Sequence, residues 1–511
     1  MLDSNLEKEI DSLYKASQGL SNEELKEKYE QFYSPKSIAE YMNELIYESK
    51  KSKIYFLDAG AGSGNLSIAF IKSILKWEKK PKQISATLYE VDNNLKSTLE
   101  ETLGYLERIC AKSDIKLIWE IKSKDFIIDT VDKINNNKKY NLFDYILINP
   151  PYKKLGINDQ HNKELIKIGI NVPNLYAAFV ALAILLLKSK GELVAITPRS
   201  FCNGVYFREF RENLKENVNF KHIHLFNSRT SVFSEDNILQ EIIIYHCIKE
   251  KWDNKKKVKI IHSTDDTFTD LSIKTVKSEQ VIYPTDLQHI IRIMKNEEDM
   301  LVVKKIEELP CNYNDLGIEI STGPIVDFRE KVELLSKRVL KDAIPYLGAN
   351  HIKQGNVEWP SRNAKYNSII VNDSNKSRMR VLNNYVLVKR ISSKEEEKRI
   401  ICAVLIPDEY NVKHIAFDNK INYIYGRKEA ISLELARGLC LYLSSSIIDI
   451  YFRIFSGHTQ VNVADLKSLK YPSKQNLIKL GEYNWSILPQ QIEIDMLVEK
   501  EVFATKEYSD I

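Results

Sequence analysis

The chain has 511 residues, of which 43% are hydrophobic and 28% are charged, and its formal net charge is +4. That length predicts two or more domains, and that composition excludes a chain that is disordered throughout. The charge is uneven, since residues 1–30 hold eight acidic and four basic side chains, and the mildly basic remainder suits a polyanionic partner and an ordinary soluble enzyme equally well.

The cysteines and the apolar runs bear on the compartment. The six cysteines have no CxxC or CxxH spacing, which predicts reduced thiols rather than a disulfide framework or a zinc site. The third residue is already charged, so we expect no signal peptide. The longest apolar run, at 175–187, is too short to span a bilayer and predicts a buried helix. We therefore expect a cytoplasmic protein with no membrane partner.

The first half of the chain begins with a polar stretch and continues as an alternation of strands and helices. Residues 1–30 have a polar helical pattern and predict a peripheral N-terminal helical element. From 31 to 245, short apolar strands precede helices: KIYFLDAG precedes a helix at 65–78, and ISATLYEVD precedes one at 93–111. This alternation predicts an α/β fold with a mostly parallel sheet that helices cover on both faces.

The second half of the chain lacks this alternation. Residues 246–300 are polar and charged, which predicts a segment that connects two domains. Residues 301–511 contain a predicted helix near 432–454 but no regular order of strands and helices. We therefore expect a mixed α+β domain there.

A glycine-rich turn follows the first predicted strand. In FLDAGAGSGNL, Phe56 to Leu66, the strand ends in Asp58, and Gly60, Gly62 and Gly64 precede a helix. Glycines let the backbone turn tightly against a ligand at such a place. The spacing is G-x-G-x-G and not the G-x-G-x-x-G of dinucleotide-binding enzymes. A merely structural strand–helix turn stays open as the alternative.

Acidic residues follow the next two predicted strands. Glu90 lies at the carboxyl end of one strand, where α/β sheets bind ligands and an acid can accept ribose hydroxyls. Asp92 is better explained as the N-cap of the following helix. Asp125 and Phe126 follow the next strand and offer an acceptor for an exocyclic amine beside a flat ring. Each residue alone is more often a cap or a core aromatic.

The stretch FDYILINPPYKKLG places Asn149, Pro150, Pro151 and Tyr152 directly after an apolar strand. A proline has no N–H to donate and fixes its own φ, so the pair must end the strand and stiffen the turn. An amide and an aromatic side chain on such a turn form either a capped loop or a reactive site.

These pieces, in this order, resemble the gamma class of amino-methyltransferases, the NPPY family that modifies N6 of adenine in DNA in bacterial restriction-modification systems. YSPKSIAEYM at 33–42 resembles the segment before the family's glycine loop, and DAGAGSG resembles the loop itself. NLYAAFVALAILLLKSKGELVAITPRSFCNG resembles the helix, strand and aromatic loop that close the target pocket. The sequence departs from the family in two places: Ser34 replaces a usual Thr, and the loop at 153–172 has no residue-by-residue match.

The resemblance implies a Rossmann-like class I methyltransferase domain over 31–245, with a mostly parallel seven-stranded sheet, that uses S-adenosylmethionine and no metal. It implies that the cofactor is bound by Ser34, Pro35, Asp58, Gly60, Gly62, Gly64, Glu90, Asp125, Phe126 and Asn149. It implies that the catalytic residues are Asn149, Pro150, Pro151 and Tyr152.

The chemistry of an amine methylation explains these residue types. An adenine amino group is a weak nucleophile because its lone pair is delocalised into the ring. The Asn149 side-chain oxygen and the Pro150 carbonyl can accept both N–H bonds and leave the lone pair directed at the methyl donor. Tyr152 is suited to stack on a base flipped out of the duplex. A second aromatic face is expected from Phe207, or else from Phe201, and a place in the core is an equal alternative for both.

Three further residues near the predicted site have two open interpretations each. Arg199 is consistent with a phosphate contact and equally with a cap on a strand end. His161 and Lys163 lie in the unmatched loop after the tetrad, which either closes over a flipped base or is a solvated surface loop.

Three segments past residue 300 resemble target-recognition domains: 316–330, 343–360 and 456–472. A basic cluster around a predicted strand is a candidate for phosphate contacts, although such clusters are more often solvated faces: Lys376, Arg378, Arg380, Lys389 and Arg390. A polar turn is expected to touch DNA or to stabilise the domain junction: Gly457, His458, Thr459 and Gln460.

We therefore predict a site-specific DNA adenine-N6 methyltransferase with a target-recognition domain over 301–511. Its predicted partners are double-stranded DNA and a cognate restriction endonuclease that acts separately, unless the enzyme is an orphan. N4-cytosine methylation is one alternative, although Asn rather than Ser at position 149 favours adenine. Methylation of a protein glutamine or of RNA, and a catalytically dead DNA-binding scaffold, are the others.

Overall fold

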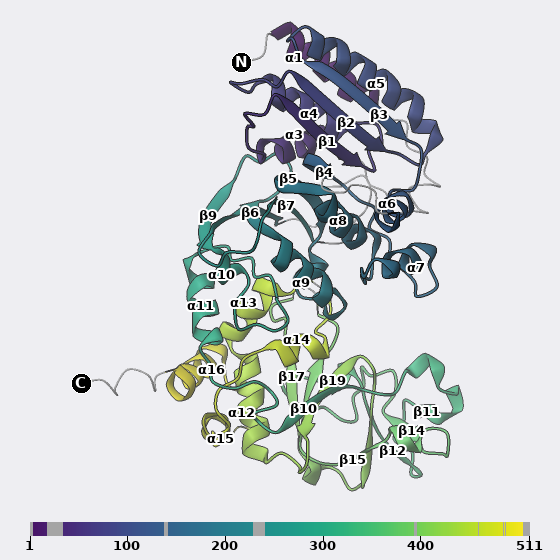
Figure 1. The fold of residues 1–511 in the computed structure, drawn as a ribbon. Helices are drawn as coiled ribbons and strands as arrows, with labels where there is room; N and C mark the ends of the chain where they lie inside the picture. Colours follow the sequence, from purple (N-terminus) through teal and green to yellow (C-terminus); the bar gives the residue numbers. More distant parts are fainter. Residues whose placement is uncertain are drawn as a thin grey trace, which may run out of the picture. The chain divides into compact units, whose positions relative to one another are not determined.

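The computed structural model describes residues 4–17, 34–136, 142–227, 241–392, 396–457, 459–483, 485 and 487–503. The chain divides into two compact units, Met1–Lys295 and Asn296–Ile511 (Figure 1). Each unit has its own sheets and its own buried residues, so each is described by itself.

The first unit contains a nine-stranded sheet in the order β3-β2-β1-β4-β5-β7-β6-β8-β9. Strands β3, β2, β1, β4 and β5 pair in parallel, β7 runs antiparallel between β5 and β6, and β8 pairs in parallel with β6. The strands are β1 (Lys53–Ala59), β2 (Gln83–Tyr89), β3 (Lys116–Lys122), β4 (Phe143–Ile148), β5 (Leu187–Pro198), β6 (Val218–Phe226), β7 (Ile242–Lys249), β8 (Lys257–Ser263) and β9 (Ser272–Lys277).

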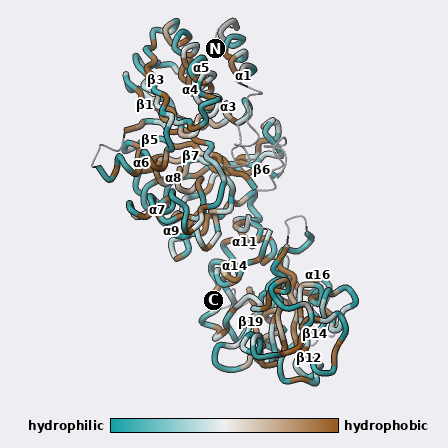
Figure 2. The backbone as a smooth tube through the Cα atoms, turned by 90° about the vertical axis from the view of Figure 1, so that its right-hand side faces the viewer, coloured by the Kyte–Doolittle hydropathy of each residue, from teal (hydrophilic) through white to brown (hydrophobic). Residues whose placement is uncertain are grey.

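Helices connect and cover these strands. They are α1 (Ser4–Ser17), α3 (Lys36–Glu44), α4 (Asn65–Leu75), α5 (Asn93–Ala111), α6 (Phe126–Asn135), α7 (Gln160–Lys167), α8 (Leu175–Leu186), α9 (Arg208–Asn217) and α10 (Ser278–Val281). Hydrophobic residues concentrate on the central strands and on α8, which Figure 2 shows in brown. Strand β4 is buried along its whole length, and nearly every residue of α8 is buried as well. The apolar run at 175–187 is therefore a core helix, as predicted.

The predicted helices agree closely with the observed ones where local signals are strong. The predicted helix at 93–111 is α5, and Asp92 is its N-cap, with a side chain that accepts a hydrogen bond from the Asn94 N–H at 2.8 Å. The helix predicted at 65–78 ends earlier, at Leu75. The N-terminal helical element is described over α1, and the rest of residues 1–30 lies outside the described residues.

The sheet has nine strands and not the seven expected, which corrects the predicted fold. The two additional strands, β8 and β9, lie within 246–300, where a connecting segment was expected. Strand β8 buries Val258 and Ile260 but exposes Lys257 and Lys259, which precede them. Charged residues on the outer face of a strand near a sheet edge protect the sheet from aggregation. Here they also interrupt the apolar run from which a strand would be predicted.

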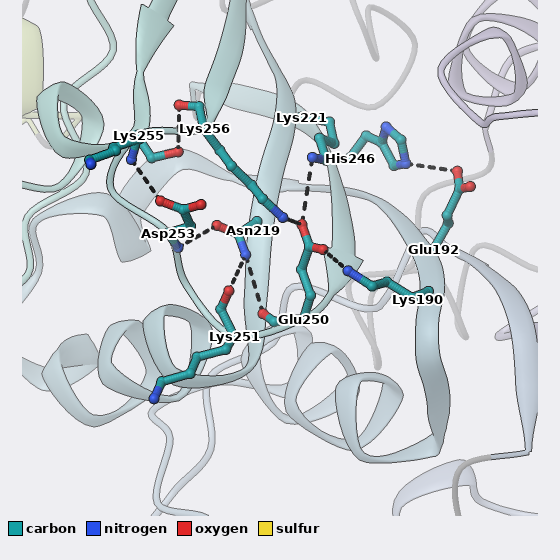
Figure 3. A network of polar contacts seen from close by, with 11 residues as sticks. Lys190, Glu192, Asn219, Lys221, His246, Glu250, Lys251, Asp253, Lys255 and Lys256 are labelled. Atoms are coloured by element: carbon teal, nitrogen blue, oxygen red, sulfur yellow. Dashed lines mark hydrogen bonds and ion pairs between the residues drawn. The ribbon is translucent and has the colours of Figure 1, made fainter.

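A network of charges holds the outer strands together at the end of β7 (Figure 3). Glu250 forms ion pairs with Lys190, Lys221 and Lys256, which come from β5, β6 and the turn before β8. Burial works against ionisation, but hydrogen bonds from Lys190 and Lys256 lower the pKa of Glu250 to about 2. Near this network, His246 Nε2 lies 2.9 Å from a Glu192 carboxylate oxygen.

The second unit is an α+β assembly with two five-stranded sheets, in the orders β10-β19-β16-β17-β13 and β11-β14-β12-β18-β15. The first sheet contains β10 (Ile318–Thr322), β13 (Gly355–Asn356), β16 (Tyr385–Lys389), β17 (Cys402–Leu405) and β19 (Ile421–Gly426). The second contains β11 (Leu335–Ser336), β12 (Ala343–Leu347), β14 (Ser368–Ile370), β15 (Arg380–Val381) and β18 (His414–Phe417). A core cluster that includes Leu387, Phe417 and Tyr423 joins strands of both sheets.

Helices complete the second unit: α11 (Glu297–Glu307), α12 (Leu433–Ser444), α13 (Ser446–Phe455), α14 (Val463–Ser468), α15 (Lys474–Gly481) and α16 (Gln491–Val498). The single helix expected near 432–454 is two helices, α12 and α13, which meet at an angle of 60°. Within the described residues, no single helix is long and apolar enough to cross a membrane, and this bent pair meets the length and composition criteria only when its two helices are combined.

Candidate active site

The glycine loop lies at the carboxyl end of β1, between that strand and α4. Gly60, Gly62 and Gly64 all have positive φ angles, of 85°, 55° and 91°. At Gly64 the φ angle favours glycine, and an added Cβ would lie 2.9 Å from the end of the Leu99 side chain, which would have to shift. The loop therefore takes a shape that other residues adopt only with strain.

Glu90 fixes the glycine loop to the end of β2. Its carboxylate accepts hydrogen bonds from the Gly62 N–H at 2.7 Å and from the Asp92 N–H at 2.8 Å. The side chain is buried, and this burial raises its pKa above the ordinary value. An acid with two backbone donors keeps a fixed orientation while further lone pairs stay available to a ligand.

Asp58 lies at the end of β1 and is completely buried. The Ser67 hydroxyl donates to one carboxylate oxygen at 2.8 Å, and the other oxygen has no partner among the described residues. Burial raises the pKa of Asp58 to about 7. Through Ser67 the side chain contacts α4, the helix that follows the loop, and it does not line either of the pockets described next.

Two pockets meet at Gly60, Glu90 and Pro151, which line both of them. The glycine-loop pocket is lined by polar and backbone groups of Ser34, Gly60, Gly62, Asn65, Glu90 and Asn149. The Asp125 pocket is more apolar. Its walls include the hydrophobic side chains of Val91, Phe126, Leu175 and Phe179, together with Asp125 and His161. The two pockets bring together residues from seven separate places in the sequence. Of the ten predicted cofactor residues, Pro35, Asp58 and Gly64 are not among the residues that line them.

Asp125 and Phe126 begin α6, three residues after β3 ends. Asp125 is the N-cap and accepts a hydrogen bond from the Ile128 N–H at 3.0 Å. Its second carboxylate oxygen lies 2.8 Å from Nε2 of His161. The Phe126 ring is buried, and its centre lies 4.9 Å from that of Phe179. The alternative of a cap is thus correct for Asp125, and the same carboxylate still faces the pocket.

The tetrad lies at the carboxyl end of β4, which pairs with β1 on one side and with β5 on the other. Asn149 donates from Nδ2 to the Ser34 hydroxyl at 3.1 Å, and its Oδ1 accepts from the Tyr152 hydroxyl at 3.4 Å. Pro150 and Pro151 are buried, so the turn is enclosed as well as stiff. Asn149 therefore lies at the wall shared by the glycine loop and the segment before α3.

Tyr152 lies beside a group of aromatic rings. Tyr152 is only 3% exposed, and its ring meets Tyr176 edge-on with centres 6.3 Å apart. Phe207 is stacked on Tyr176, with ring centres 5.7 Å apart and an angle of 18° between the ring planes. Phe201 is 1% exposed and packs against Phe210 and Tyr245, which places it in the hydrophobic core. Phe201 also meets Tyr176, with ring centres 6.4 Å apart, and Phe207 is buried like Phe201, so the core alternative describes both rings.

The remaining predicted residues divide between structural and pocket positions. Arg199 forms a buried ion pair with Glu241 at 2.9 Å, so its position is that of a strand-end contact. Lys163 is exposed on α7, and His161 lines the Asp125 pocket.

All six cysteines have free thiols. Among the described residues, no cluster of three or more His, Cys, Asp or Glu side chains could hold a metal ion.

The basic residues of the second unit make contacts within that unit. Lys376 pairs with Asp373 and Arg378 with Glu330. Arg380 donates to the Tyr423 hydroxyl at 2.9 Å, and Arg390 donates to the Asn419 carbonyl at 3.1 Å. Burial lowers the pKa of Lys389. In the predicted polar turn, the Ser392 N–H donates to the Thr459 carbonyl, Ile391 pairs with Gln460, and His458 lies outside the described residues.

Several pocket residues were not predicted from the sequence. Asn65 lines the glycine-loop pocket and donates from Nδ2 to the Ser34 carbonyl at 2.9 Å. Its position directly after the last loop glycine is a signal that could have identified it. Phe179 and Leu175 lie within the apolar run of α8, where no sequence feature distinguishes the face toward the pocket.

Comparisons with known proteins identify the family of the chain. Residues 68–233 match the family described as Eco57I restriction-modification methylase. The chain is 37% identical over 499 residues to Type II methyltransferase M.PstI of Providencia stuartii, with 96% of each chain covered. It is 39% identical over 479 residues to Type II methyltransferase M.BsuBI of Bacillus subtilis, with 92% of this chain and 93% of that one covered. A solved DrdV–DNA complex is a distant likeness, with 13% identity, a TM-score of 0.47, and coverage of 94% of this chain and 60% of that one.

Proposed function

Because the chain belongs to the family of Type II restriction-modification methyltransferases, we propose that it transfers a methyl group from S-adenosylmethionine to N6 of an adenine flipped out of duplex DNA. The observation that carries this proposal is the position of Asn149. Its amide lies at the carboxyl end of β4, on the wall of a pocket that also contains the glycine loop and Glu90. Ligands of open α/β sheets bind at this edge, where neighbouring strands diverge into separate loops.

The donor set of the two pockets fits S-adenosylmethionine. The apolar walls of the Asp125 pocket suit a flat purine, and the Asp125 carboxylate suits its exocyclic amine. Glu90 stands between the pockets, where it suits the ribose hydroxyls, and the positive φ angles of the glycine loop let the backbone approach a ligand closely. When bound, S-adenosylmethionine supplies an activated methyl group on a sulfonium.

The tetrad has the groups that amine methylation requires. The Asn149 side-chain oxygen and the Pro150 carbonyl act as acceptors for the two N–H bonds of the target amine. The Ser34 hydroxyl and the Tyr152 hydroxyl hold the Asn149 amide from opposite ends, which fixes its orientation before a base arrives. Two buried prolines prevent the turn from relaxing. Such preorganisation positions the amine and lowers the barrier without prior deprotonation, and the amine releases one proton to solvent once it has accepted the methyl group.

Tyr152 and Phe207 hold the flipped base in this proposal. Flipping costs a few kcal/mol, and a stacked aromatic ring returns about 1–3 kcal/mol of that cost. Because Tyr152 is almost fully buried in the described state, a base reaches its face only if neighbouring side chains shift. The Tyr176 ring contacts both of them, edge-on to Tyr152 and stacked on Phe207.

The second unit is assigned to recognition of the target sequence in duplex DNA. It follows the catalytic unit in the chain, it has sheets and a core of its own, and its segments resemble target-recognition domains. A cognate restriction endonuclease is the predicted separate partner. The cytoplasmic location stays a prediction.

Substitution of Asn149 tests the proposal. Asn149→Ala removes one of the two acceptors, so methyl transfer to duplex DNA should fall by at least about a hundredfold. Binding of S-adenosylmethionine, measured by isothermal titration calorimetry, should change little, because Glu90 and Asp125 remain in place. The matched control is Asn136→Ala at the exposed end of α6, which should leave both quantities unchanged.

Two outcomes would contradict the proposal. Near-normal transfer by Asn149→Ala would show that the amide is not an acceptor for the reacting amine. A wild-type protein that binds no S-adenosylmethionine would show that the pockets hold a different ligand.

A further inference from the structure

His161 closes one side of the Asp125 pocket, although it lies in a loop that follows the catalytic tetrad. Its Nε2 lies 2.8 Å from Oδ2 of Asp125, and its Nδ1 lies 3.1 Å from Oδ1 of Asp159. Both contacts involve carboxylate oxygens, which only accept hydrogen bonds when ionised. A ring with both nitrogens protonated satisfies both contacts at once.

The loop that carries His161 is closed at its base. Lys154 pairs with Asn174, the Leu155 N–H donates to the Pro173 carbonyl at 2.8 Å, and the Leu175 N–H donates to the Lys153 carbonyl at 2.9 Å. The loop thus leaves the tetrad and returns directly into α8, whose Leu175 also lines the Asp125 pocket. Its helix α7 packs against α6, which begins at Asp125.

The position of His161 within this loop is itself fixed. Asp159 is the N-cap of α7, and its Oδ1 accepts from the backbone N–H of His161 at 2.9 Å as well as facing the ring. The imidazole therefore contacts Asp159 of its own helix on one side and Asp125 on the other.

These contacts affect the ionisation of both groups. The hydrogen bond to Asp125 raises the pKa of His161 above its ordinary value of 6.5. Burial opposes ionisation of Asp125, but hydrogen bonds from His161 and the Ile128 N–H lower its pKa overall.

We infer that His161 is a positioning residue for the cofactor's purine: its imidazolium holds the Asp125 carboxylate ionised and oriented so that the carboxylate can accept the exocyclic amine. This inference rests on the proposed use of S-adenosylmethionine and assigns a role to a residue outside the family's motifs. It also makes the loop after the tetrad part of the cofactor site.

The geometry distinguishes this role from two simpler ones. His161 is half-buried and lines the pocket, so it is not a solvated surface residue. The pocket remains open beside the His161–Asp125 pair, so the histidine does not fill the place of a ring. Oδ1 of Asp125 is occupied by the Ile128 N–H, and Oδ2 by His161, which leaves each oxygen one further lone pair.

Charged groups around the imidazole set the expected pH dependence. Asp125 at the start of α6 and Asp159 at the start of α7 contact the ring, and Glu90 and Lys124 are the other charged residues that line the same pocket. Neutral His161 has a single N–H and can no longer donate to both carboxylates. Cofactor affinity should therefore fall as the pH rises through the pKa of His161, which lies above 6.5.

The test measures binding of S-adenosylmethionine to the full chain by isothermal titration calorimetry from pH 6 to pH 9, without DNA. His161→Ala should weaken binding by about tenfold at pH 6.5, the size of a hydrogen bond to a charged group. His161→Gln can still donate one hydrogen bond to Asp125, so it should restore part of the affinity and give a flat pH profile. Lys167→Ala, an exposed position on the same helix, is the matched control and should behave as wild type.

A second measurement is independent of the cofactor. The pKa of His161 in the unliganded protein, followed by NMR and assigned with His161→Gln, should decrease in Asp125→Asn.

A double variant tests whether His161 acts through Asp125. In the Asp125→Asn background, His161→Ala should cause little further loss of affinity for S-adenosylmethionine.

The outcomes separate this inference from the proposed function. If wild type binds no S-adenosylmethionine, the proposed function fails. If wild type binds it and His161→Ala binds equally well or more tightly, with the Lys167→Ala profile unchanged, only the positioning role of His161 is wrong. A loss in His161→Ala that is equally large in the Asp125→Asn background would also overturn that role.

Discussion

Asp58 shows how a single residue of the glycine loop region can reduce stability. Its carboxyl group is fully buried, has one hydrogen bond from Ser67, and has a pKa raised to about 7. An acid whose pKa is higher in the folded than in the unfolded chain contributes stability at low pH. That contribution is lost as the pH rises from the ordinary value of 3.8 toward about 7.

Asp58→Asn should therefore stabilise the unliganded protein in a pH-dependent way. The free energy of unfolding of the variant should exceed that of wild type by an amount that widens from pH 5 to pH 7, by at most about 1.4 kcal/mol per pH unit. Above about pH 7 the difference should stay constant. Chemical denaturation at a series of pH values checks this, and a difference that does not vary with pH would be evidence against a buried, titrating Asp58.

At the scale of an element, the glycine loop is defined by its conformation and not only by its composition. Gly64 has a φ of 91° and is the N-cap of α4, and its missing Cβ leaves room for Leu99 of α5. Gly104 lies within α5, and an added Cβ there would meet no atom within 4 Å. A side chain is therefore unfavourable at Gly64 and has room at Gly104.

Gly64→Ala and Gly104→Ala form a matched pair. Gly64→Ala should destabilise the protein by about 1–3 kcal/mol, because alanine is strained at that φ and contacts Leu99. Gly104→Ala should stabilise it by about 0.5–1 kcal/mol, because alanine loses less backbone entropy in a helix. Thermal or denaturant unfolding of both variants measures these shifts. Equal effects of the two substitutions would mean that the loop conformation is not the one described.

The elements that could be predicted from the sequence are those with local signals. Asp92 and the amphipathic residues after it specify α5 to the residue, and the glycine loop and tetrad mark the ends of β1 and β4. Strand β8 was missed because lysines alternate with its first buried residues, and β9 was missed because Val276 is its only buried residue. Phe179 and His161 reach the pockets only through the folding of α8 and α7, which no single stretch of sequence encodes.

At the scale of the whole molecule, the proposed function assigns cofactor binding and methyl transfer to the first unit and recognition of the target sequence to the second. All residues that line the two pockets belong to Met1–Lys295, and Asn296–Ile511 has its own core. A chain that ends at Lys295 should therefore bind S-adenosylmethionine about as tightly as the full chain but should not methylate duplex DNA at a specific site. Circular dichroism establishes that the shortened chain is folded, and calorimetry measures its affinity. Full site-specific activity without residues 296–511 would contradict the division.

The central claim is that the Asn149 turn presents an adenine amine to the methyl donor. Mass spectrometry of nucleosides from duplex DNA, treated with the wild-type protein and S-adenosylmethionine, tests it most directly, with Asn149→Ala as the control. We predict N6-methyladenine in the wild-type reaction and only traces of it with Asn149→Ala. N4-methylcytosine as the product, or no modified nucleoside at all from a protein that binds the cofactor, would contradict the account.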